Sequence, residues 1–259
     1  MATYLDRILL RHREVAAADR RPIDALVADA TAMPAARGFA AALGDRNQLH
    51  VIGEVKRRSP SKGDLNVGLD PAALAAQYAA GGASCLSVLT DDEFFGGSVA
   101  DLRAARAACA MPVLRKDFTV SLRDVCDARL MGADCVLLIA AALHSEELIE
   151  MHALATQIGL DSLVEIHDEH ELEIAIAAGA TLIGVNQRDL ATFQVDHDRA
   201  VRMAAAIPDA SVKVAESGVR HRGDAEALHA AGYHAVLVGE TLVVSGDPTA
   251  AIRALRGAA

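Results

Sequence analysis

The chain has 259 residues, of which 52% are hydrophobic, so it can bury a large core as one barrel-sized domain or as two smaller ones. Its formal net charge of -10 argues against nucleic acid as a partner, because phosphate backbones are held by clustered lysines and arginines. No apolar run reaches the roughly 18 residues of a membrane helix. The N-terminus has no uninterrupted apolar core for a signal peptide and is too acidic for a transit peptide, so we expect a cytoplasmic protein without membrane contact.

The first 45 residues predict a helical extension ahead of the first strand, with helices over residues 4–17 and 22–30. Such helices could cap one end of the fold or cover an active site. They could also pack on the surface without any part in chemistry, since docking needs only an apolar face. We expect residues 1–259 to form a single domain that includes this extension.

Eight short apolar runs follow, separated by Ala-rich amphipathic stretches, a pattern typical of parallel strands covered on both faces by helices. A glycine precedes every second run, at intervals of about 50 residues, where it can end a helix in the left-handed conformation. This repeat favours an α/β fold, the (β/α)8 TIM barrel, although periodicity alone also allows an open doubly wound sheet. The predicted strands are residues 50–56, 84–90, 112–116, 134–140, 162–167, 181–186, 211–215 and 234–239.

Polar side chains end five of these strands, where a parallel barrel places its catalytic groups. Glu54 and Lys56 point to the same side of the first strand, and a charged pair that ends a buried strand is costly unless it is paired or functional. Two lysines beside carboxylates indicate acid–base or Schiff-base chemistry. The polar residues at the other strand ends are Lys116, Glu165, Asn186, Glu216 and Ser217.

Glycine turns after the seventh and eighth strands predict a phosphate site. Gly218 and Gly239 stand where barrels hold phosphate on backbone N–H groups, and Arg188 at the sixth strand can reach the same place. We therefore expect a small phosphorylated ligand. Phe118 would form an apolar wall of the pocket beside Lys116, whereas Phe94 is equally consistent with a pocket wall and with simple packing.

We expect no metal ion. Residues 167–170 contain two histidines without a strong third ligand, and the acidic residues 91–93 are interpreted as a solvated approach to a helix. The four cysteines have no C-x-x-C spacing, so we expect them to be reduced, buried and structural.

At these positions the sequence resembles the indole-3-glycerol-phosphate synthase family. The resemblance spans nearly the whole barrel and includes the family's N-terminal helical extension. It implies that 1-(2-carboxyphenylamino)-1-deoxyribulose 5-phosphate is cyclised, decarboxylated and dehydrated without an organic cofactor or metal, in tryptophan biosynthesis. The matching motifs are Glu54-Val-Lys56-Arg-Arg-Ser59-Pro60-Ser61, Leu89-Thr90 with Phe94-Phe95-Gly96-Gly97-Ser98, Leu114-Arg-Lys116-Asp117-Phe118, Leu163-Val-Glu165-Ile-His167, Asn186-Gln-Arg188-Asp-Leu190 and Ala215-Glu216-Ser217-Gly218.

The resemblance also implies roles for single residues. Lys116 would be the general acid that protonates the ketone oxygen, and Lys56, oriented by Glu54, would hold the substrate carboxylate and could join later proton transfers. Glu165 would act as general base or acid in the dehydration. Residues that would position the hydroxyls and the carboxylate are Asn186, Glu216 and Ser217. Residues that would surround the phosphate are Ser59, Arg188, Gly218, Gly239 and the backbone of Glu240.

Two rival functions remain open from the residues. A barrel aldolase or sugar-phosphate isomerase would use Lys116 or Lys56 to form a Schiff base with a carbonyl substrate. A non-catalytic barrel would only bind a sugar phosphate or a partner protein, since fold does not fix function. The sequence does not set the oligomeric state, and a monomer is our expectation.

Overall fold

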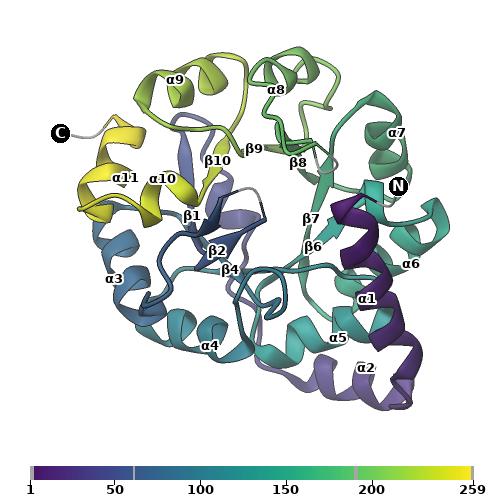
Figure 1. Ribbon diagram of the computed structural model, residues 1–259. Helices are drawn as coiled ribbons and strands as arrows, with labels where there is room; N and C mark the ends of the chain where they lie inside the picture. The colour runs from purple at the N-terminus through teal and green to yellow at the C-terminus, as the bar shows by residue number, and fades with distance from the viewer. Residues whose placement is uncertain (1–2, 61, 190–191, 258–259) are drawn as a thin grey trace.

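The computed structural model describes residues 3–60, 62–189 and 192–257; the motif residues Ser61 and Leu190 lie outside them. Eight parallel strands form a closed barrel in the order β1-β10-β9-β8-β7-β6-β5-β4, with helices around it (Figure 1). The predicted α/β barrel is confirmed, and each predicted strand overlaps an observed one. The barrel strands are β1 (His50–Val55), β4 (Cys85–Leu89), β5 (Val113–Lys116), β6 (Cys135–Ile139), β7 (Asp161–Ile166), β8 (Leu182–Asn186), β9 (Val212–Glu216) and β10 (Ala235–Val238).

The strands are buried almost throughout because alternate side chains enter two different cores. One set fills the barrel interior, and the other packs against the surrounding helices. At the end where the strands begin, Phe39 and Leu43 of the N-terminal extension are fully buried and join the interior core. The inward-facing apolar residues are Ile52, Cys85, Leu114, Leu137, Leu163, Leu182, Val214 and Leu237.

Local capping explains where the barrel helices begin and end. The side chains of Ser98, Ser121 and Asp168 accept backbone N–H groups at helix starts. The four predicted glycines all have positive φ, from 83° at Gly179 to 101° at Gly232, as a left-handed helix end requires. The helices are α3 (Pro71–Gly81), α4 (Val99–Ala108), α5 (Leu122–Met131), α6 (Ser145–Gln157), α7 (Glu169–Ala177), α8 (Arg199–Met203), α9 (Arg222–Ala230), α10 (Glu240–Val243) and α11 (Pro248–Arg256).

Shorter elements lie outside this alternation. Two-residue strands β2 (Arg58–Ser59) and β3 (Gly63–Asp64) pair in the loop after β1. Single 3-10 turns are η1 (Ala41–Leu43) and η2 (Ala140–Ala142).

The predicted N-terminal helices are present as α1 (Tyr4–Ala18) and α2 (Ile23–Ala32). A capping box between Thr3 and Asp6 starts α1. Helix α2 packs against α5, whereas α1 crosses in front of the barrel (Figure 1). Tyr4, Leu5 and Ile8 of α1 line the cavity at the mouth, so the extension covers this site.

The cysteines are free, and Cys85, Cys126 and Cys135 are buried, while Cys109 is half-buried. Burial raises the pKa of the Cys85 and Cys135 thiols, so both stay protonated. In the part of the chain that the structure describes, no helix is long and apolar enough to cross a membrane.

Candidate active site

A cavity of about 700 Å³ opens at the carboxyl ends of the strands, beneath α1. Its polar lining comes from β1, β5, β7, β8 and β9 and from the loops that follow β1, β8, β9 and β10. The structure brings together every residue predicted to act in catalysis or in phosphate binding. These lining residues are Glu54, Lys56, Ser59, Lys116, Glu165, Asn186, Arg188, Glu216, Ser217, Gly218, Gly239 and Glu240.

Glu54 and Lys56 form a close ion pair at the end of β1. Lys56 Nζ donates to Glu54 Oε1 at 2.5 Å. Burial opposes ionisation of Glu54, but the charges of Lys56 and Lys116 outweigh it and lower the pKa of this carboxyl. A Cβ on Gly239 would lie 2.3 Å from the same oxygen, so the turn after β10 needs a glycine for this pair to fit. The pair is therefore an ionised, fixed element of the cavity wall.

Lys116 lies among carboxylates from other strands. Its Nζ is 3.4 Å from Glu165 Oε2 and 3.9 Å from Glu216 Oε2. Burial disfavours the ammonium form, but the surrounding carboxyl groups, above all Glu165, outweigh it and raise the pKa of Lys116. A lysine held in the charged form can donate a proton. Schiff-base formation needs the neutral amine, so this environment disfavours the aldolase-type rival.

Glu165 and Glu216 are neighbouring buried carboxyls with opposite pKa shifts. Burial opposes ionisation of both, but Lys116 outweighs it at Glu165, and the pKa of Glu165 is lowered. Burial and the negative charge of Glu165 raise the pKa of Glu216. Asn186 Nδ2 donates to Glu165 Oε1 at 3.1 Å. One carboxyl is therefore ionised while the other holds a proton, so the pair can both accept and donate protons.

The predicted phosphate side is built from turns after β9 and β10. Ser217 and Gly218 have φ of 65° and 77°, and left-handed backbone at a non-glycine residue such as Ser217 is a strain that concentrates at functional sites. Arg188 reaches across, where its Nη1 donates to the carbonyl of Phe193 at 3.1 Å. Ser59 Oγ is buried without a hydrogen-bond partner among the described residues. The arrangement offers a cation, a hydroxyl and backbone N–H groups to one anion.

Phe118 lines the cavity as predicted, but Phe94 does not. The adjacent Phe95 lines it instead, with its ring centroid 6.1 Å from that of Phe118. The ring of Phe94 packs edge-on against Tyr4 of α1, at 5.9 Å. Asp91 Oδ1 accepts the N–H groups of both phenylalanines in one tight turn, so two consecutive side chains leave it in different directions. Of the two alternatives expected for Phe94, packing is therefore the one that these contacts favour.

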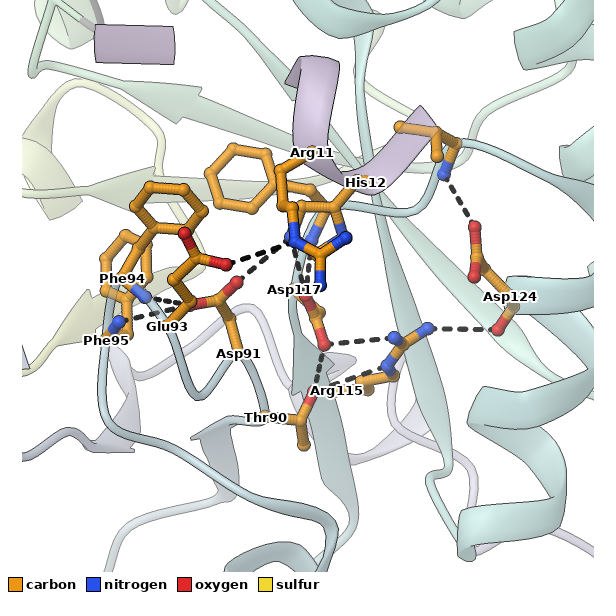
Figure 2. A network of polar contacts seen from close by, with 12 residues as sticks. Arg11, His12, Thr90, Asp91, Glu93, Phe94, Phe95, Arg115, Asp117 and Asp124 are labelled. Carbon is orange, nitrogen blue, oxygen red and sulfur yellow. Dashed lines mark hydrogen bonds and ion pairs between the residues drawn. The ribbon is translucent and has the colours of Figure 1, made fainter. Parts of the chain in front are cut away.

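A polar network beside this wall joins α1 to the loops after β4 and β5 (Figure 2). His12 Nε2 lies 3.0 Å from Asp91 Oδ2, and Arg115 Nη2 donates to Asp117 at 2.9 Å. Asp91 is only 7% exposed, so the interpretation of its loop as solvated is wrong for this residue. Four residues recur at helical spacing on one face of α1, and this pattern is a sequence signal for the face that meets the site: Tyr4, Leu5, Ile8 and His12.

His12, Asp91 and Asp117 form the group of potential metal ligands found within the described ranges. Their carboxylate oxygens already have protein partners, because Asp91 caps a turn and Asp117 accepts from Arg115. The Arg115 cation beside Asp117 would oppose a divalent ion. At the other histidine-rich segment, His167 Nδ1 lies 3.1 Å from Glu171 Oε2, and His170 is exposed. These contacts fit a structural network better than a metal centre.

Comparison with known proteins places this geometry in one family. Residues 5–255 match the model of the indole-3-glycerol phosphate synthase family. An indole-3-glycerol phosphate synthase from Nocardioides sp. is 55% identical over 207 residues, which cover 80% of each chain. One from Rhodopirellula baltica is 44% identical over 98% of each chain, and indole-3-glycerol phosphate synthase 2 of Streptomyces coelicolor is 50% identical over 88% of each.

A solved thiamine phosphate pyrophosphorylase from Pyrococcus furiosus is similar in fold, with a TM-score of 0.61 over 82% of this chain and 96% of that one. At 15% sequence identity, this similarity shows the barrel architecture alone. The family match and the three curated relatives span most of the chain. The chain therefore belongs to the indole-3-glycerol phosphate synthase family.

Proposed function

We propose that the cavity converts 1-(2-carboxyphenylamino)-1-deoxyribulose 5-phosphate into indole-3-glycerol phosphate, a carbon–carbon lyase step of tryptophan biosynthesis. The observation that carries this proposal is the position of Lys116, a cation beside the buried carboxylates of Glu165 and Glu216 and facing an apolar aromatic wall. Ring closure builds charge at several atoms, and a fixed cation among carboxylates can stabilise and discharge it.

Ring closure joins an aromatic carbon to the ketone carbon of the substrate. Lys116 acts as general acid and gives its proton to the ketone oxygen, which becomes a hydroxyl group. Lys56 binds the substrate carboxylate, and Glu54, 2.5 Å away, orients its ammonium group. Loss of carbon dioxide then returns the bonding electron pair to the ring. No organic cofactor or metal ion takes part in the proposed sequence.

Dehydration completes the indole. The hydroxyl group leaves as water and the adjacent carbon gives up a proton, with Glu165 as general base or acid. Asn186 bonds Glu165 and holds its carboxylate in place. Together with Glu216 and Ser217, Asn186 positions the substrate's hydroxyl and carboxylate groups. Lys56 and Lys116 are the other candidates for proton transfer in this step.

The remaining lining residues bind the two ends of the substrate. Phe118 and Phe95 pack against the aromatic ring. The proposed phosphate ligands are Ser59, Arg188, Gly218, Gly239 and the backbone of Glu240. The partner is thus a small phosphorylated molecule, and nucleic acid and membranes are not partners. We further propose that residues 1–259 fold as one domain and act as a monomer in the cytoplasm.

Indole fluorescence tests this function directly. Wild-type protein mixed with the carboxyphenylamino-deoxyribulose phosphate, without added metal or cofactor, is expected to give an indole signal. Lys116→Ala should lower kcat roughly 10²- to 10⁴-fold because it removes the general acid. Lys213→Met is the matched control, since the Lys213 ammonium group donates to the carbonyl of Ala204 and Lys213 is not among the described cavity-lining residues.

No indole signal from folded wild-type protein would contradict the proposal. Borohydride trapping separates it from the aldolase-type rival, in which reduction of a Schiff base links substrate and lysine covalently. We expect no such adduct. Unchanged turnover in Lys116→Ala would remove the acid assignment and favour a different proton donor.

A further inference from the structure

Helix α1 covers the cavity and is held there by both apolar and polar contacts; Leu9 packs against the interior core and the ring of Tyr4 against Phe94. Of its residues, which the structure describes in full, Ile8 alone is buried. Polar contacts add to this docking. Arg13 forms two hydrogen bonds to Glu147 on α6, both at 2.8 Å, and the exposed Arg11 reaches Glu93. Side-chain bonds to the barrel therefore add to the apolar contacts that hold the helix over the mouth.

His12 differs from these anchors because it reaches two loops of the barrel. Its Nε2 lies 3.0 Å from Asp91 Oδ2, in the loop after β4, and 3.9 Å from Asp117 Oδ1, in the loop after β5. Its ring also packs against that of Phe118, with centroids 5.5 Å apart. As Figure 2 shows, the imidazole stands between α1 and both carboxylates. One side chain thus joins α1 to two loops of the active site.

Both aspartates organise the aromatic wall of the cavity. Asp91 Oδ1 accepts the N–H of Phe95 at 3.1 Å, and Asp117 Oδ1 accepts that of Phe118 at 2.8 Å. Burial opposes ionisation of Asp117, but Arg115 outweighs it and lowers the pKa of this carboxyl. These bonds fix the two residues whose rings face the cavity, and Asp117 directly follows Lys116 in sequence.

We propose that His12 is a positioning residue for the reaction: by bridging Asp91 and Asp117 it holds α1 over the cavity and fixes the aromatic wall on which the substrate ring packs. This inference rests on the proposed function. His12 is not among the described residues that line the cavity, so it acts through its neighbours. The wall contacts the substrate in the ground state and in the transition state alike. Its loss therefore weakens binding and raises KM more than it lowers kcat.

The test uses the full chain with three variants. His12→Ala should raise KM about tenfold or more and change kcat less than about threefold, because one charge-assisted hydrogen bond to a buried carboxylate is lost. His12→Gln should recover most of the affinity, since its amide can donate to Asp91 from a similar position. Arg13→Ala removes an anchor of the same helix one residue away, on Glu147, and should leave KM within about twofold of wild type.

Hydrogen exchange supplies a readout that needs no turnover. His12→Ala should speed amide exchange in residues 4–12 and 91–95 of the free protein, and His12→Gln should restore protection. Unchanged KM and exchange in His12→Ala would overturn the inference. An equal KM rise in Arg13→Ala would also overturn it, because any loosening of α1 would then explain the effect without the bridge from His12 to Asp91 and Asp117. Absence of indole from wild type would reject the proposed function instead, and exchange would still decide whether His12 holds α1.

Discussion

Glu216 is a single cavity residue whose burial lowers the stability of the fold at neutral pH. Its carboxyl is 2% exposed, and its Oε1 has no hydrogen-bond partner within the described part of the chain. Burial and the charge of Glu165 raise its pKa. A carboxyl whose pKa is higher in the folded than in the unfolded protein stabilises the fold below its unfolded pKa, which is near 4.5. This contribution is lost as the pH rises toward the pKa in the folded protein. Glu216 thus weakens the fold at neutral pH.

Glu216→Gln is therefore expected to stabilise the protein while it impairs catalysis. The amide is isosteric, is neutral without having to take up a proton at pH 7, and can donate to Glu165. We expect a gain of roughly 1 to 3 kcal/mol in the free energy of unfolding at pH 7, shrinking toward zero near pH 4.5. Urea unfolding at both pH values measures it. A destabilised variant at pH 7 would mean that the contact of Glu216 with Lys116 outweighs its burial cost.

At the scale of elements, a glycine in β8 leaves room for the Glu216 carboxyl. Gly184 lies next to Glu216, and a Cβ there would stand 2.2 Å from Glu216 Oε1 and 3.2 Å from Leu163 Cδ1. Gly184→Ala should push the Glu216 side chain out of position and lower kcat at least about tenfold. The control is Gly246→Ala, where a Cβ meets no described atom within 4 Å and the backbone is unstrained. Steady-state kinetics of both variants decide, and equal kcat values would show that Glu216 yields without loss.

The sequence predicts those elements that depend on interactions between residues close together in the chain. The strands and the glycine helix ends were predictable because side-chain periodicity and the φ of Gly82 or Gly132 are local properties. The path of α1 across the mouth was not, because the contact of His12 with Asp91 joins residues far apart in the chain. The sequence also left open whether Phe94 faces the cavity, because two consecutive aromatic residues carry no periodicity that says which one does.

At the scale of the whole molecule, the barrel separates an apolar interior from a charged mouth. Inward residues such as Leu114 and Leu163 fill the interior near the strand starts, and Lys116 and Glu165 follow two positions later on the same faces. The positions of the proposed catalytic residues were therefore predictable from strand periodicity, since each lies at the end of a strand or directly after it. Their mutual distances and pKa shifts were not, because these depend on the closure of the barrel.

This charged mouth makes acid stability a property of the whole fold. Burial opposes ionisation of Glu54, Asp117 and Glu165, but adjacent Lys or Arg charges outweigh it and lower the pKa of all three. A carboxyl whose pKa is lower in the folded than in the unfolded protein stabilises the fold above its unfolded pKa. This stabilisation is lost as the pH falls through the pKa in the folded protein. We therefore expect the urea midpoint to fall steeply below about pH 4.5.

Glu54→Gln removes one of these titrating carboxyls and should make the fall of the urea midpoint with decreasing pH shallower. At pH 7 the urea midpoint of the variant should be lower than that of wild type, because Lys56 loses its close partner. Urea midpoints for both proteins between pH 7 and pH 3.5 test the expectation. Parallel curves would show that Glu54 has the same pKa in the folded and unfolded chains. The ion pair with Lys56 would then contribute nothing to holding the barrel mouth together, and its place at the end of β1 would be explained by catalysis alone.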